Sequence, residues 1–207
     1  MPQVLKPELR ARILSAGLEV FAAQGYLGAT MTAIAERAGL GAASLYRYFP
    51  SKAELFEAAI TPEIAARFER LLQQRVRALA EQPAPARFEP SQDYGAEMLE
   101  FWLEHRLAVV VLLDRAQGSA YEHYGERFVA LLLKSTLEQI RNSGAKVQIT
   151  PAARLVLARI FESTRTTLAS ILAHSDNPRV LRQAIEAFWS YQIPGLYGFA
   201  RWLRQQA

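Results

Sequence analysis

The groups in this chain best suited to binding chemistry stand close together, between positions 44 and 52. Ser44, Tyr46 and Tyr48 carry hydroxyls, Arg47 carries a guanidinium and Lys52 carries an ammonium group. Hydroxyls and cations of this kind form hydrogen bonds with phosphate oxygens and with the edges of bases. Their types and spacing therefore indicate recognition of a nucleic acid rather than bond-making chemistry.

These side chains need a rigid support, and the residues before them predict two short helices joined by a tight turn. Ile34, Ala35 and Ala38 share one helical face and are spaced to pack inward. Gly39 is free to adopt the left-handed backbone conformation that ends a helix, and Leu45 anchors the next one. This layout is a helix-turn-helix, in which the second helix lies in the major groove of DNA. An ordinary helical hairpin explains the alanines and leucines, but not the polar and aromatic groups that follow.

In this region the sequence resembles the TetR family of bacterial transcriptional regulators. The resemblance covers roughly the first 55 of the 207 residues. The matching residues are Phe21, Gly25, Thr30, Ile34, Ala35, Ala38, Gly39, Leu45, Tyr46, Phe49, Ser51, Lys52 and Leu55. Two positions depart from the family pattern. Gly41 stands where a serine or similar helix cap is common, and Ala43 stands where glycine is frequent. We expect these departures to affect which operator is bound rather than whether DNA is bound.

The resemblance implies a ligand-responsive regulator, a repressor, that binds a palindromic double-stranded DNA operator as a homodimer. A small, apolar effector is expected to release it. The expected DNA contacts are Thr30, Thr32, Ala42, Ala43, Ser44, Tyr46, Arg47, Tyr48 and Lys52. In the family a lysine at the place of Lys52 grips the phosphate backbone. Arg47 suits either phosphate or guanine, and the ring of Tyr46 suits either the core or the groove.

Periodicity predicts an all-α protein of about nine helices. The expected helices are residues 6–24, 31–38, 42–48, 51–81 with an interruption at Pro62, 91–105, 106–117, 119–142, 150–174 and 177–205. Residues 82–90, which contain three prolines, are the expected linker. We divide the chain into a three-helix DNA-binding domain, residues 1–50, and a larger helical effector-binding and dimerisation domain, residues 51–207.

The larger domain holds two further sets of candidate residues. Aromatic and polar side chains suited to an effector pocket are Phe101, Trp102, His105, Tyr121, Tyr124 and Phe128. For any one of them, an ordinary place in the core is the better expectation. The last two helices are apolar on more than one face, which is typical of helices buried both in their own core and against a partner. Their candidate interface residues are Leu155, Phe161, Leu168, Leu172, Phe188 and Trp189.

Composition excludes several other classes of protein. The chain has no cysteine, so disulfides and thiolate metal sites are ruled out. Its net charge of +4 is compatible with a nucleic-acid partner. The N-terminus lacks the apolar stretch of a signal peptide, and the longest aliphatic run, Leu107 to Leu113, is far below the ~20 residues that span a bilayer. We therefore expect a cytoplasmic protein, with no membrane, no cofactor and no metal.

Two alternatives to a DNA-binding regulator remain open at this point. A helical-bundle enzyme would use Glu-x-x-His motifs on facing helices, but none of the three histidines has a glutamate three positions before it. Neither a phosphate-binding glycine loop nor a nucleophile elbow is present. The other alternative is an adaptor whose two-helix unit binds a protein; strong salt dependence of duplex binding would argue against it.

Overall fold

The computed structural model of the protein describes residues 6–81, 93–142 and 148–205. These residues form ten α-helices and one short π-helix, η1, with no β-strand among them. In chain order the elements are α1 (Pro7–Gly28), α2 (Met31–Arg37), α3 (Ala42–Tyr48), α4 (Lys52–Ala59), α5 (Pro62–Glu81), α6 (Asp93–Glu104), α7 (Arg106–Val110), η1 (Val111–Arg115), α8 (Tyr124–Asn142), α9 (Pro151–His174) and α10 (Pro178–Gln205).

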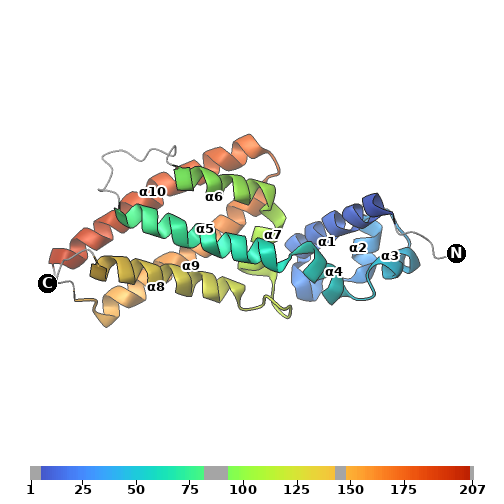
Figure 1. Ribbon diagram of the computed structural model, residues 1–207, viewed down its shortest axis with the longest axis horizontal. Coiled ribbons are helices and arrows are strands. Elements are labelled where there is room, and N and C mark those ends of the chain that lie inside the picture. The colour runs from blue at the N-terminus through green and yellow to red at the C-terminus, as the bar shows by residue number, and fades with distance from the viewer. Residues whose placement is uncertain (1–5, 82–92, 143–147, 206–207) are drawn as a thin grey trace.

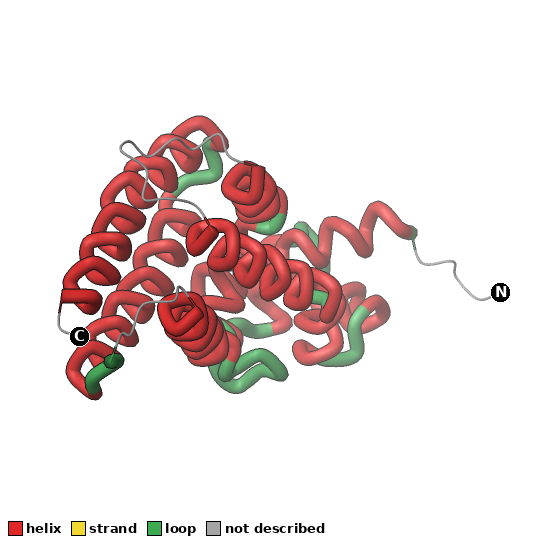
Figure 2. Tube along the Cα trace, turned by 60° about the vertical axis from the view of Figure 1, so that its left-hand side comes forward, coloured by secondary structure: helices red, strands yellow, loops and turns green. Residues whose placement is uncertain are grey.

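The helices form two units that lie end to end (Figure 1). A small unit near the N-terminus holds α1 to α4, and a larger body holds α5, α6, α8, α9 and α10, with α7 and η1 at the junction. Figure 2 shows several helices of the body packed side by side. The prediction of an all-α protein with an N-terminal helix-turn-helix unit and a larger C-terminal helical domain is confirmed.

The expected helix 51–81 is two helices, which raises the count from about nine to ten. α4 ends at Ala59, and α5 begins at Pro62. Proline has no backbone N–H and clashes with the preceding helical turn, so it opens a new helix instead of continuing the old one. This break separates the small unit from the body.

α4 belongs by packing to the small unit. The ring of Phe56 on α4 lies 5.1 Å from that of Phe21 and 4.9 Å from that of Tyr26, measured between centroids, and both contacts are edge-on. Leu55 and Ile13 are fully buried in the same core. The domain boundary expected from the sequence, between residues 50 and 51, lies just before this helix.

The region around residues 105–123 is less regular than periodicity predicts. Residues 106–117, expected to be one helix, form α7 followed by the π-helix η1. The expected helix 119–142 begins only at Tyr124, because the chain turns before it and Gly118 has a φ of 80°. The expected linker 82–90 lies outside the described residues.

η1 lies between the two units of the fold. It packs against α1 on one side and against α8 and α9 on the other. The carbonyl oxygen of Arg115 comes close to Gly25, where α1 bends with a φ of 72°. η1 and its neighbour α7 therefore form much of the contact between the body and the small unit. None of the described helices is both long enough and apolar enough to cross a membrane.

Candidate nucleic-acid interface and internal cavity

The turn between α2 and α3 has the geometry of a Schellman motif. The N–H of Leu40 donates to the carbonyl oxygen of Ala35 at 2.8 Å, and the N–H of Gly39 donates to that of Glu36 at 3.0 Å. Gly39 has a φ of 65°, in the left-handed region that favours glycine. At its other end, α2 is capped by Thr30, whose hydroxyl accepts from the N–H of Ala33 at 3.1 Å. Local hydrogen bonds thus fix the angle at which α3 leaves α2.

α3 presents one face to solvent along its length. Ala42, Ala43, Tyr46 and Arg47 are exposed, and Tyr46 keeps half of its surface accessible. Leu45, on the opposite side, is fully buried and anchors the helix. The exposed residues combine small groups, which allow close approach, with a phenol and a guanidinium, which form hydrogen bonds. Such a face can enter a groove of duplex DNA.

Other predicted contact residues are partly engaged within the protein. The hydroxyl of Tyr48 accepts a hydrogen bond from the backbone N–H of Lys6 at 3.1 Å, which ties the end of α3 to the start of α1. Ser44 is half-buried and accepts from the guanidinium of Arg47 at 3.1 Å. Thr32 is exposed on α2. Tyr48 thus holds α3 against the rest of the small unit through this hydrogen bond.

Lys52 occupies a different position from the one expected. Its ammonium group donates to the carbonyl oxygens of Tyr26 at 2.7 Å and Ala29 at 2.9 Å, near the C-terminal end of α1. It also lies 4.4 Å from the centre of the Tyr26 ring. A cation at a helix C-terminus is favourable because the last carbonyls carry partial negative charge. In this geometry Lys52 joins α4 to α1 instead of reaching outward to phosphate.

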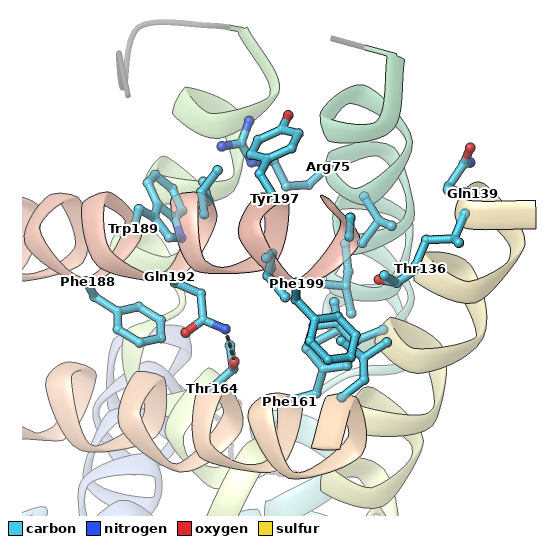
Figure 3. Close-up of a pocket in the computed structure, with 18 of the residues that line it drawn as sticks. Arg75, Thr136, Gln139, Phe161, Thr164, Phe188, Trp189, Gln192, Tyr197 and Phe199 are labelled. Carbon is cyan, nitrogen blue, oxygen red and sulfur yellow. Dashed lines mark hydrogen bonds between the residues drawn. The ribbon is translucent and has the colours of Figure 1, made fainter. Parts of the chain in front are cut away.

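The body contains an internal cavity of about 360 Å³. It lies among α5, α6, α8, α9 and α10, and its walls are mainly apolar (Figure 3). Its size is within the range of small-molecule sites. About a third of the lining residues carry polar or charged side chains. The amide of Gln192 donates to the hydroxyl of Thr164 at 2.9 Å, and these two residues lie between α10 and α9.

Two of the six predicted pocket residues, Trp102 and Phe128, line this cavity. The other four are not among its described lining residues.

Phe101 and Tyr124 are buried against Phe68, at 5.7 Å and 6.0 Å between ring centroids. The hydroxyl of Tyr124 donates to the carbonyl of Ala65, and its burial raises the pKa of that hydroxyl. His105 packs against Phe101 with its ring tilted, and Tyr121 approaches Phe56 of the small unit. Aromatic composition alone could not separate these core positions from the cavity wall.

Sequence reasoning missed Arg75, a charged residue in the cavity wall. Its guanidinium lies 5.4 Å from the centre of the Trp189 ring, and burial lowers the pKa of Arg75. Arg75 follows Leu71 and Leu72 by four and three positions, so it falls on the buried face of α5. The sequence signal for this site was a single cationic residue, Arg75, on the otherwise apolar face of α5.

Residues 13–59 match the family described as bacterial regulatory proteins, tetR family. The chain is 45% identical over 64 residues to the HTH-type transcriptional repressor KstR of Mycolicibacterium smegmatis, which is 31% of this chain and 29% of KstR. It is 43% identical over 53 residues to the HTH-type transcriptional regulator SrpR of Pseudomonas putida, which is 26% of this chain and 25% of SrpR. Residues 13–59 therefore carry the tetR-family segment.

The match spans less than a third of the length of either curated relative. Among solved structures, a TetR family transcriptional regulator from Chloroflexus aurantiacus aligns with 98% of this chain and 94% of its own, at 17% identity and a TM-score of 0.49. The TetR-family match runs from Ile13 on α1 to Ala59, the last residue of α4. It therefore covers the helix-turn-helix unit and leaves the cavity outside.

Most of the predicted dimer-interface residues lie inside one protomer. Phe161, Leu168, Leu172 and Trp189 are at most 7% exposed, and Phe188 lines the cavity. Side chains that fill their own core offer little surface to a partner, and a role for these residues in a dimer interface stays a prediction. Leu155 differs from them, since 58% of its surface is exposed on α9.

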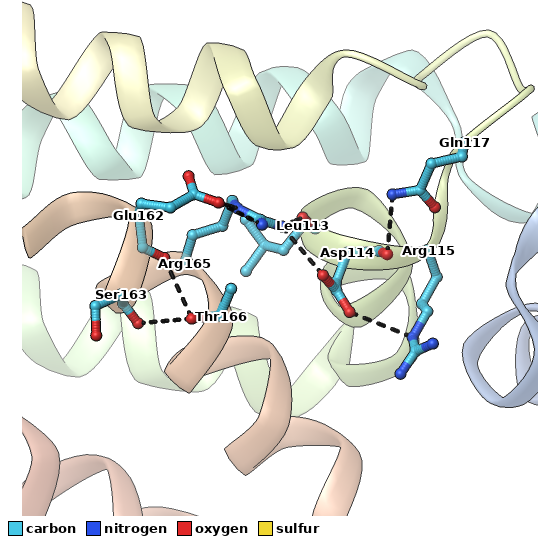
Figure 4. A network of polar contacts seen from close by, with 8 residues as sticks. All are labelled: Leu113, Asp114, Arg115, Gln117, Glu162, Ser163, Arg165 and Thr166. Carbon is cyan, nitrogen blue, oxygen red and sulfur yellow. Dashed lines mark hydrogen bonds and ion pairs between the residues drawn. The ribbon is translucent and has the colours of Figure 1, made fainter. Parts of the chain in front are cut away.

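Arg165 connects the helix that lines the cavity to η1 (Figure 4). Its guanidinium donates to Oδ1 of Asp114 at 3.2 Å and to the carbonyl oxygen of Leu113. It also donates to Oε1 of Glu162, one turn earlier on α9, at 2.6 Å. Only 15% of the Arg165 side chain is exposed, whereas the side chains of Asp114 and Glu162 are 35% and 41% exposed, so these charge-assisted hydrogen bonds are partly shielded from solvent. They hold α9 against the junction of the two units.

Proposed function

We propose that this protein is a TetR-family transcription regulator, a repressor, that binds an inverted-repeat DNA operator as a homodimer and is released by a small ligand in its internal cavity. The observation that carries the proposal is α3, which exposes Ala42, Ala43, Tyr46 and Arg47 beyond a helix-turn-helix bend. The relatives of this segment, KstR and SrpR, are a transcriptional repressor and a transcriptional regulator.

Selection of bound duplexes from a random pool tests the DNA-binding part. We expect an inverted repeat whose half-site centres lie about one helical turn, ~34 Å, apart. Arg47→Ala is the informative variant, because it removes the exposed guanidinium of α3 while the anchor Leu45 stays buried. Failure to enrich any sequence, with equal recovery by wild type and variant, would refute DNA recognition. Binding that ignores salt and nonspecific duplex would point instead to a protein-binding adaptor.

The homodimer is supported by the outward faces of α9 and α10. Among the described residues, five of the seven exposed large hydrophobic side chains belong to these helices: Leu155, Val156, Val180, Tyr191 and Trp202. Exposed apolar groups concentrated on one pair of helices are typical of a protein–protein interface. Pairing of the same face in two copies is the isologous arrangement that a palindromic operator requires.

Release by ligand is supported by the connection from the cavity to the small unit. Thr164 lines the cavity and precedes Arg165, which holds Leu113 and Asp114 of η1. η1 in turn packs against α1. A ligand that fits the cavity better in one arrangement of α9 would shift the population of angles between the small unit and the body. In a dimer that angle sets the spacing of the two recognition helices.

A further inference from the structure

The charged residues that line the cavity all have the same sign. They are Arg75, Arg201 and Arg204, and no aspartate or glutamate is among the described lining residues. Arg201 and Arg204 are exposed near the end of α10, whereas Arg75 is half-buried on α5. The remainder of the wall is dominated by leucine, isoleucine, phenylalanine and tryptophan. Such a lining disfavours cationic ligands and favours anionic ones.

Arg75 has no carboxylate partner within the described chain: each described ion pair involves other residues. Its guanidinium lies 5.4 Å from the centre of the Trp189 ring, and it interacts electrostatically with the phenol of Tyr197. Figure 3 shows Arg75 and Tyr197 together on one side of α10, with the Gln192–Thr164 pair on its other side. A partly desolvated guanidinium without a counter-ion is costly, and a ligand carboxylate would offset that cost.

A second polar group in the wall also lacks a partner. Trp102 is 4% exposed, and its indole Nε1 has no hydrogen-bond acceptor among the described residues. The Trp102 ring lies 5.5 Å from that of Trp189, and the guanidinium of Arg75 lies over the Trp189 ring. Buried indole N–H groups are normally satisfied, so an unsatisfied one in a cavity wall suits a ligand that brings an acceptor. Arg75, Trp189 and Trp102 thus form a connected series that supplies charge, ring surface and a donor.

We propose that the cavity binds an amphiphilic carboxylic acid, with its carboxylate paired to Arg75 and its hydrocarbon portion held among the apolar walls. The proposal rests on the proposed function, in which this cavity is the effector site, and it assigns the chemical class of that effector. The guanidinium of Arg75 can receive both oxygens of a carboxylate at once, a geometry that an ammonium cannot reproduce. The apolar portion supplies affinity, and the charge supplies selection against neutral and cationic compounds of the same shape.

A series of ligands that share one hydrocarbon tail and differ in headgroup charge tests the proposal. The probes are dodecanoate, dodecan-1-ol and dodecyltrimethylammonium, each titrated below its micelle concentration. Trp102 and Trp189 line the cavity, so their fluorescence reports binding, and Trp202→Phe removes the third, surface tryptophan from the signal. We expect dodecanoate to bind at least ~10-fold more tightly than the alcohol, and the ammonium compound more weakly than both. Equal affinity for acid and alcohol would overturn the proposal.

Two variants identify the cation that pairs with the ligand carboxylate. Arg75→Met keeps most of the side-chain volume and should reduce dodecanoate to the affinity of dodecan-1-ol, while the alcohol itself is unaffected. Arg77→Met is the matched control, since Arg77 is exposed on the same helix and lines a separate surface groove. Loss of the carboxylate preference in Arg77→Met instead of Arg75→Met would place the headgroup outside the cavity and refute the assignment. Circular dichroism establishes that both variants fold.

The outcomes separate this inference from the proposed function. If the alcohol binds as well as the acid and also weakens operator binding, the cavity is an effector site but the carboxylate assignment is wrong. If none of the three probes binds, the assignment is also wrong, and the selection of duplexes decides the DNA-binding role on its own. Preference for dodecanoate that depends on Arg75 supports the assignment whether or not an operator has been found.

Discussion

Arg165 on α9 and Asp114 in η1 are joined by a hydrogen bond of 3.2 Å across the junction of the two units. The same guanidinium nitrogen also donates to the carbonyl oxygen of Leu113. This arrangement leaves little space, because Gly125 on α8 lies against both groups. A Cβ added at Gly125 would be 2.6 Å from the Leu113 oxygen and 3.2 Å from Cδ of Arg165. Three elements, α8, α9 and η1, therefore meet at a point where only glycine fits.

Gly125→Ala is expected to destabilise the protein by about 1–3 kcal/mol, the usual cost of overpacking a filled site. The clash is with a backbone oxygen, which cannot rotate away as a side-chain end would. Thermal unfolding of the two proteins measures the difference. Gly28→Ala is the control, since a Cβ there makes only an ordinary contact with Gln24 at 3.6 Å. Equal melting temperatures for wild type and Gly125→Ala would show that the junction is loosely packed.

Lys52→Met is expected to lower the melting temperature and leave the salt dependence of operator binding unchanged. The ammonium of Lys52 bonds to the carbonyls of Tyr26 and Ala29, and hydrogen bonds to charged groups contribute about 1.5–3 kcal/mol each. A phosphate contact would behave differently, because its removal reduces the slope of log K against log salt by about 0.9. Titrations at several salt concentrations distinguish the two roles. A reduced slope with unchanged stability would restore Lys52 as a phosphate contact.

Stability is expected to decline as the pH falls below neutrality, in part through His105. Burial lowers the pKa of His105 below its ordinary value of 6.5, while Glu104 raises it and Arg67 lowers it further. The unfolded chain therefore takes up a proton at a higher pH than the folded chain does. The resulting loss of stability is absent well above pH 6.5 and appears as the pH falls through 6.5. It stops growing below the pKa of His105 in the folded protein. In His105→Gln, the unfolding free energy should fall less between pH 7 and pH 5 than it does in the wild type. An identical pH profile in both proteins would contradict this account.

Tyr191→Glu is expected to convert the proposed homodimer to a monomer. Tyr191 is 79% exposed on α10 in one protomer, and a carboxylate there would have to be buried, facing its own copy, in the paired state. Light scattering after gel filtration measures the mass at micromolar concentration. Gln73→Glu on α5 adds the same charge at another exposed site and should remain dimeric. A wild-type protein that elutes as a monomer would refute the dimer itself.

The family and the helix-turn-helix were predictable from sequence because the interactions that form them are local. The Schellman turn at Gly39, the cap at Thr30 and the cap at Ser51 join residues five or fewer positions apart. Proline breaks are equally local, so the starts of α9 and α10 at Pro151 and Pro178 were predicted correctly. The spacing of residues along the sequence is therefore enough to predict turns, helix caps and proline breaks.

Tertiary structure alone decided which neighbours each side chain has. Lys52 finds its carbonyl partners 23 and 26 residues earlier in the chain, and Arg165 finds Asp114 51 residues earlier. Phe101 and Phe128 are both aromatic, yet Phe101 fills the core and Phe128 lines the cavity. Periodicity gives the face of a helix that turns inward, but it does not specify whether that face meets packed side chains or a cavity. That depends on how five helices are set against one another, which no single segment encodes.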